Sequence, residues 1–104
     1  MTATGTVGFS PLMFAAAIDE TPETLTQLIE AGAELDERGF GGGTALIKAA
    51  RFNRNPEMIA ILVAAGADPE LRDDRGLTAL DWALKNKALR DSDVIGELEI
   101  ATGL

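Results

Sequence analysis

The chain has 104 residues with no cysteine and no histidine, and its nine basic and seventeen acidic residues give a net charge of -8 at pH 7. This length suits one domain with a modest core, and the missing residue types exclude disulfide scaffolds, thiolate nucleophiles, imidazole bases and ordinary zinc sites. The negative charge disfavours nucleic acid and anionic membranes as partners and favours a basic protein surface, although an acidic exterior that serves only solubility is the commoner explanation.

The first segment, residues 1–17, contains the apolar run LMFAAA and could be mistaken for a secretion signal. No basic residue precedes that run, and Ser10 and Pro11 interrupt the apolar stretch. No window approaches the roughly 18 apolar residues that a membrane helix requires. We therefore expect mature structure here, no membrane partner and a cytoplasmic location.

A repeated block begins at residue 10: SPLMFAA at 10–16, TALIKAA at 44–50 and TALDWAL at 78–84. The leucines Leu12, Leu46 and Leu80 are 34 residues apart in both steps. Each block opens with a Ser or Thr that can accept a hydrogen bond from a free backbone N–H at a helix start. The period predicts three copies of one unit, each beginning with a short helix.

A longer apolar run follows each of the first two blocks, LTQLIEAGA at 25–33 and MIAILVAAGA at 58–67. The spacing of the apolar residues is helical, and Gly32 and Gly66 suit a left-handed exit from a helix. The unit is therefore predicted to be a turn, a short helix, a break, a second helix and a glycine exit.

The third unit differs from the others. Thr78 and Asp81 have the spacing of a capping box, with Asp in place of the usual Glu or Gln. The run at 92–101 aligns with 56–65 only at an offset of 36, so we expect the extra residues between the two helices. Glu99 takes the place of an apolar residue, which predicts a last helix that faces water and caps an array that is complete or nearly so.

These residues resemble the ankyrin repeat, with its T-P-L-H-x-A signature and a period of about 33 residues. The DDRGLTALDWAL stretch at 73–84 carries the pattern most completely, whereas Met13, Ile47 and Asp81 stand where the signature has His. The resemblance implies an all-α fold, a solenoid of three helix-turn-helix repeats with β-turn or loop tips. It makes residues 1–104 a single domain with repeats at about 5–37, 38–71 and 72–104.

The resemblance also implies that a protein partner docks on the concave face, which the tips and the exposed side of the short helices form. Phe14 and Trp82 could instead pack on neighbouring short helices. Lys48, Arg51 and Lys85 would add positive charge and favour a carboxylate on the partner, although an ordinary solvated rim is the slightly better explanation of these charges. The candidate partner-binding residues are Phe9, Phe14, Ile18, Phe40, Lys48, Arg51, Phe52, Arg75, Leu77, Trp82 and Lys85.

No catalytic residue, cofactor or metal ligand is expected. The glycine-rich GFGGGT at 39–44 lacks the lysine of a phosphate-binding loop, and the acidic clusters lack calcium-loop spacing. The function predicted is a protein-interaction module, such as an adaptor, an inhibitor or an immunity-type protein, that is monomeric. The alternatives are a self-associating homo-oligomer and, more remotely, a carboxylate-dependent hydrolase.

Overall fold

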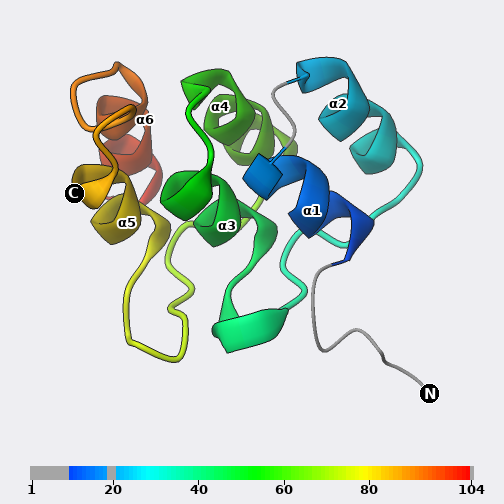
Figure 1. Ribbon diagram of the computed structural model, residues 1–104, viewed down its shortest axis with the longest axis horizontal. Coiled ribbons are helices and arrows are strands. Elements are labelled where there is room, and N and C mark those ends of the chain that lie inside the picture. Colours follow the sequence, from blue (N-terminus) through cyan, green and yellow to red (C-terminus); the bar gives the residue numbers. More distant parts are fainter. Residues whose placement is uncertain (1–9, 19–20, 104) are drawn as a thin grey trace.

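A computed structural model describes residues 10–18 and 21–103 of the chain, and its regular elements there are helices, with no strand. Figure 1 shows two rows of helices, which we call the inner row (α1, α3 and α5) and the outer row (α2, α4 and α6). The loops before α3 and α5 project below the inner row, and we call residues 39–43 the second tip and residues 73–77 the third tip. Each predicted repeat contains one helix of each row. The elements are α1 (Pro11–Ile18), α2 (Pro22–Glu30), the 3-10 turn η1 (Phe40–Gly42), α3 (Ala45–Phe52), α4 (Pro56–Ala65), α5 (Ala79–Lys85) and α6 (Val94–Ala101).

The predicted caps start the inner helices. The hydroxyls of Ser10, Thr44 and Thr78 each accept a hydrogen bond from the backbone N–H three residues further on, at 3.2, 3.3 and 3.3 Å. Asp81 completes the capping box, because its Oδ2 accepts both the backbone N–H and the hydroxyl of Thr78. Asp81 stands where the ankyrin signature has His, and it bonds to Thr78 from that position.

Proline and glycine fix the ends of the outer helices. Pro22 and Pro56 lie at the first helical positions of α2 and α4, where a missing N–H has no helical partner to lose. Gly32 and Gly66 leave these helices with φ of 97° and 103°, in the left-handed region. The structure therefore confirms both predicted exits.

A continuous core lies between the two rows and between successive repeats. Each inner helix packs on the next, and each outer helix does the same. The leucines that define the period are buried, and so are the alanines three residues after them, whose small size lets the inner helices approach. These residues are Leu12, Leu46, Leu80, Ala15, Ala49 and Ala83.

The third repeat holds its extra residues between its helices, as predicted. Residues 86–93 connect α5 to α6, whereas residues 53–55 suffice between α3 and α4. Leu89 in this longer connection is completely buried and extends the core. Glu99 on α6 is exposed, which confirms that this helix turns that position to water.

Two asparagines join successive repeats. Asn53 Nδ2 donates to the carbonyl of Ala16 at 2.8 Å, and Asn86 Nδ2 donates to the carbonyl of Ala50 at 3.0 Å. The two acceptors are one period apart, so the same bond recurs at both junctions. These bonds satisfy carbonyls at the ends of α1 and α3 and hold the inner row in register.

Candidate functional site

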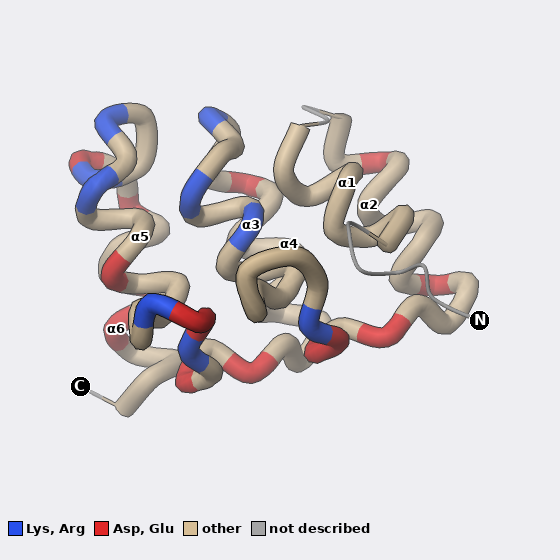
Figure 2. Tube along the Cα trace, turned by 60° about the horizontal axis from the view of Figure 1, so that its bottom comes forward, with Lys and Arg blue, Asp and Glu red and all other residues tan. Residues whose placement is uncertain are grey.

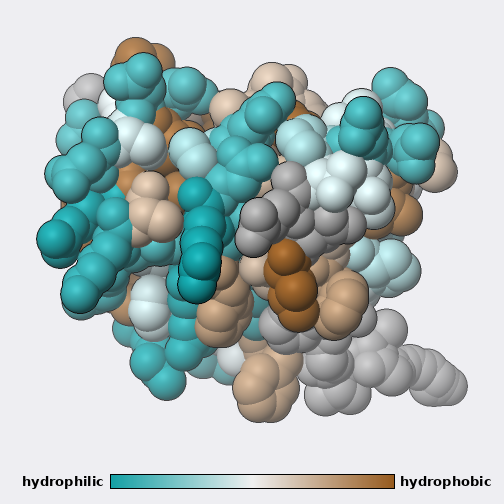
Figure 3. Space-filling model, turned by 45° about the horizontal axis from the view of Figure 1, so that its top comes forward, coloured by the Kyte–Doolittle hydropathy of each residue, from teal (hydrophilic) through white to brown (hydrophobic). Residues whose placement is uncertain are grey.

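Four of the apolar side chains predicted for the partner-binding face are exposed. The exposed fractions are 57% for Phe14, 59% for Ile18, 67% for Phe40 and 49% for Phe52. In Figure 3 apolar surface lies toward the α1 side of the inner row, and hydrophilic surface covers the α5 side. Phe9 lies outside the described residues. The inner row thus exposes Phe14, Ile18 and Phe52, and η1 exposes Phe40, as large apolar groups outside the core.

Trp82 and Leu77 are only partly exposed. The indole of Trp82 packs against the core, and its Nε1 donates a hydrogen bond to Asp73 Oδ2 at 2.8 Å. Trp82 therefore stabilises the third tip, in line with the packing alternative, and also presents part of its ring to the inner face.

Asp73 organises the third tip. Its Oδ1 accepts the backbone N–H groups of Arg75 at 2.9 Å and Leu77 at 3.0 Å, while Oδ2 accepts the indole of Trp82. Partial burial works to raise the pKa of Asp73, but these hydrogen bonds and the nearby charge of Arg51 outweigh it and lower the pKa. The tip is thus built around a carboxylate.

Lys48 does not add charge to the surface, which corrects the prediction for this residue. Its side chain is 3% exposed, and its ammonium donates to the carbonyl of Phe40 and lies 6.0 Å from that ring. Burial lowers the pKa of Lys48, the charge of Arg51 lowers it further, and Asp73 works against both. Lys48 therefore stabilises the second tip from a buried position, because its aliphatic side chain is long enough to reach the tip from α3.

Arg51 lies between two aromatic rings. The carbon at the centre of its guanidinium is 4.4 Å from the ring centroid of Trp82 and 4.8 Å from that of Phe52. Arg75 approaches Trp82 as well, at 5.8 Å. These distances are within the range of cation–π attraction. The structure thus brings Arg51, Phe52, Arg75 and Trp82 together, as four of the predicted residues.

Arg38 ties the second tip to the third, and Arg72 braces the third tip. Arg38 donates to the carbonyl of Gly42 at 3.0 Å and also to that of Arg72, and Arg72 donates to the carbonyl of Gly76 at 2.8 Å. The backbone N–H of Asp74 donates to the carbonyl of Gly41 at 2.9 Å. These guanidiniums hold the tips in place.

The remaining cations gather at one end of the inner row. Figure 2 shows them at the C-terminal ends of α3 and α5 and in the connections that follow, while the tips carry both signs. Of these residues, Arg51 and Lys85 were predicted, and Lys85 is exposed. Sequence reasoning missed the others, although basic residues within a few positions of two helix ends were a usable signal. The missed residues are Arg54, Lys87 and Arg90, all exposed.

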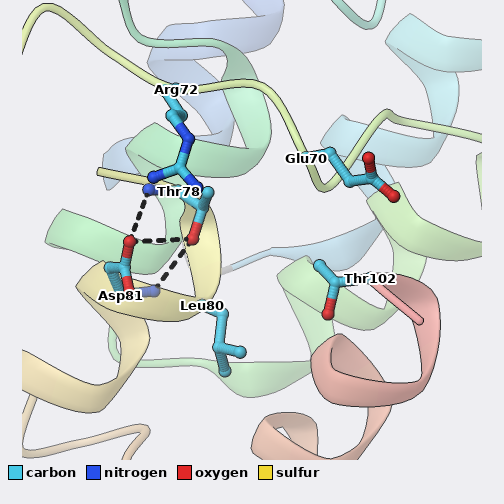
Figure 4. Close-up of a pocket in the computed structure, with 6 residues that line it drawn as sticks. All are labelled: Glu70, Arg72, Thr78, Leu80, Asp81 and Thr102. Carbon is cyan, nitrogen blue, oxygen red and sulfur yellow. Dashed lines mark hydrogen bonds between the residues drawn. The ribbon is translucent and has the colours of Figure 1, made fainter. Parts of the chain in front are cut away.

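The pocket in Figure 4 lies away from this cluster, between the start of α5 and the end of α6. Its volume is about 420 Å³, and its lining includes Glu70, Asp81 and Thr102. Glu70 is exposed and Asp81 completes the capping box, so the two carboxylates do not form the buried acid pair that the hydrolase alternative requires.

Across the described residues, no group of three or more acidic, cysteine or histidine side chains is placed to hold a metal ion. No helix in the same part of the chain has the length and apolar character needed to cross a membrane.

A comparison with protein-family models gives one finding: the family described as "Ankyrin repeats (3 copies)" matches residues 11–98. The match covers α1 through most of α6. No curated protein matches the chain in a sequence search.

Proposed function

Because the chain belongs to the ankyrin-repeat family, whose members are in general protein–protein interaction modules, we propose that it binds a protein partner through the inner row and the tips. Binding, rather than catalysis, is the proposed activity. An adaptor or an inhibitor would both work in this way, as would an immunity-type protein.

The exposure of Phe14, Ile18 and Phe52 along the inner row carries this proposal. Each is about half exposed or more, although the same helices bury their leucines and alanines completely or nearly so. Aromatic residues, phenylalanine included, are enriched at protein interfaces. Their supporting helices are fixed at both ends by caps and by the asparagine bonds, so little ordering is needed on binding.

Phe52 is the residue to test, since Trp82 also supports the third tip and its replacement would disturb folding. We expect Phe52→Glu to abolish partner capture in extracts of the organism that makes the protein, with unchanged helical circular dichroism. Ile100→Glu is the matched control, because Ile100 is 79% exposed on α6 in the outer row. A photo-crosslinking residue should likewise trap the partner from position 52 and not from position 100.

Equal capture by the two variants would place the partner elsewhere on the molecule. Cross-links that join position 52 to a second copy of the chain would support the homo-oligomer instead, and the mass in solution would then double.

A further inference from the structure

Arg51 has a fixed position with unused hydrogen-bond donors. Its guanidinium contacts the rings of Phe52 and Trp82 at 4.8 and 4.4 Å. Trp82 is held in turn by the core and by Asp73. An arginine that is stacked in this way loses less side-chain entropy when it binds a ligand than a free one does.

The nine cations of the chain divide into two groups by what they contact. Arg38, Lys48 and Arg72 donate to backbone carbonyls in or beside the tips. Arg51, by contrast, makes no side-chain hydrogen bond or ion pair within residues 10–18 and 21–103, although it is partly exposed. The same is true of Arg54, Arg75, Lys85, Lys87 and Arg90.

The neighbouring carboxylate of Asp73 interacts with the charge of Arg51 but accepts no hydrogen bond from it. Both oxygens of Asp73 already accept hydrogen bonds from Arg75, Leu77 and Trp82. Lys85 lies one period after Arg51 on the adjacent helix α5, and Arg54 lies two residues beyond the end of α3. The ends of α3 and α5 and the connections that follow them carry an excess of positive charge in a protein whose net charge is -8, because they hold Arg51, Arg54, Lys85, Lys87 and Arg90 against Asp91 and Asp93 (Figure 2).

We propose that Arg51 is a carboxylate-binding residue, at which an acidic segment of the partner protein docks with its apolar side chains against Phe52. The planar guanidinium can hold both oxygens of one carboxylate, and the surrounding cations attract further acidic groups. The proposal rests on the proposed function and specifies the chemistry of the partner. A basic partner surface, which the net charge favours, would be repelled at this face.

The single tryptophan of the chain makes this site measurable, because Trp82 contacts Arg51 directly. The probe is a capped Glu-Glu-Leu-Glu-Glu peptide, titrated against the whole chain while the fluorescence of Trp82 is followed. The capped Gln-Gln-Leu-Gln-Gln peptide has the same size without the charge. We expect a saturable change with the first peptide, weakened by added salt, and none with the second.

Arg51→Gln should weaken binding of the acidic peptide by roughly tenfold or more, as expected for the loss of a charge-assisted hydrogen-bonded pair. Arg51→Lys, which keeps the charge without the planar fork, should fall in between. Gln27→Glu on α2 in the outer row changes the net charge by the same amount at an exposed position outside the cluster, and it should leave the affinity unchanged. Circular dichroism verifies that each variant is folded.

Equal binding of the two peptides, or an unchanged affinity of Arg51→Gln, would overturn the proposal. So would inorganic phosphate or a single-stranded oligonucleotide that binds as tightly as the acidic peptide, since the site would then select anions in general. If Phe52→Glu still abolishes partner capture in that case, the docking face stands and only the carboxylate site is wrong.

Discussion

The second and third tips close on equivalent backbone hydrogen bonds but have different supports, and Gly41 has a φ of 74° where the third tip has Arg75, which does not adopt a positive φ. Gly39 N–H donates to Gly43 O in one, and Asp73 N–H donates to Leu77 O in the other, one period later. The third tip is tied by the carboxylate of Asp73, whereas glycine stands at that position in the second tip.

Positions 48 and 82 are equivalent in the repeat, and each sends a donor into its own tip. Lys48 donates to a carbonyl of the second tip, and Trp82 donates to a carboxylate of the third. The same scaffold position can therefore carry a buried ammonium or an indole. The residue at this position decides whether the surface of the inner row includes an aromatic ring there.

The largest difference between the tips should appear when their anchors are removed. We expect Trp82→Ala to lower the free energy of unfolding by about 3 kcal/mol, because it removes packing, a hydrogen bond and the ring beside Arg51. Lys48→Met keeps the apolar stem and relieves the burial of a charge, so it should change stability by less than about 1 kcal/mol. Urea unfolding followed by circular dichroism gives both values, and equal losses would contradict the distinction.

The carboxylate of the third tip should contribute the next largest effect. Asp73→Ala deprives three N–H groups of a charged acceptor, at a cost of about 2 kcal/mol after water replaces part of the interaction. Gly39→Ala is the matched change in the second tip, and it removes no side-chain bond. A loss for Asp73→Ala no greater than for Gly39→Ala would show that the third tip does not depend on this carboxylate.

Alanine substitutions at two equivalent glycines test the contact between the tips. Gly42 and Gly76 both have a left-handed φ, of 78° and 80°, so alanine at either costs about 1 kcal/mol. A Cβ on Gly42 would also lie 2.4 Å from Asp74 Oδ1 and 3.0 Å from Asp74 N, whereas a Cβ on Gly76 meets nothing within 4 Å. Gly42→Ala should therefore be the more destabilising by about 1 kcal/mol. Thermal unfolding of the two variants should give the lower midpoint for Gly42→Ala, and equal midpoints would mean that the tips do not press on each other.

The loss of unfolding free energy at acidic pH should depend on Asp73. Its pKa is lower in the folded chain than its ordinary value of 3.8, so its contribution is present above that value and is lost as pH falls through the folded pKa. The difference in unfolding free energy between the wild type and Asp73→Asn should therefore shrink in that range. Denaturation at a series of acidic pH values measures it, and a difference that is independent of pH would contradict this assignment.

The smallest expected effect is a change in the free energy of unfolding at alkaline pH, which comes from Lys48, whose ammonium donates to the second tip. Burial lowers the pKa of Lys48 below 10.5, so the unfolded chain binds that proton more tightly than the folded chain. Stability should therefore rise as pH increases from the folded pKa toward 10.5. Lys48→Met should lack this rise, and an identical pH profile for the variant would show that Lys48 titrates normally.

Much of the fold could be predicted from the sequence because its signals are local. The hydroxyls of Ser10, Thr44 and Thr78 accept bonds from residues only three positions away, and Gly32 and Gly66 act through their own φ. The period of 34 then places each unit against a copy of itself, so the buried leucines follow from the helical spacing.

The candidate site could be predicted only in part, because equivalent positions in a repeat have different neighbours. Phe14, Ile18 and Phe52 were assigned correctly to exposed positions by the repeat geometry alone. The geometry gave Lys48 the same assignment, but its stem folds back into the second tip and the residue is buried.

The sequence by itself determined where the inner helices begin, where α2 and α4 end, how many repeats there are and which apolar residues fill much of the core, since these depend on spacing along the chain. Only the tertiary structure decided which cations make no side-chain hydrogen bond or ion pair within the described residues, and that Arg51 lies between Phe52 and Trp82. The reason is physical: whether a long charged side chain pairs, stacks or reaches water depends on groups that adjacent repeats bring within a few ångströms of it.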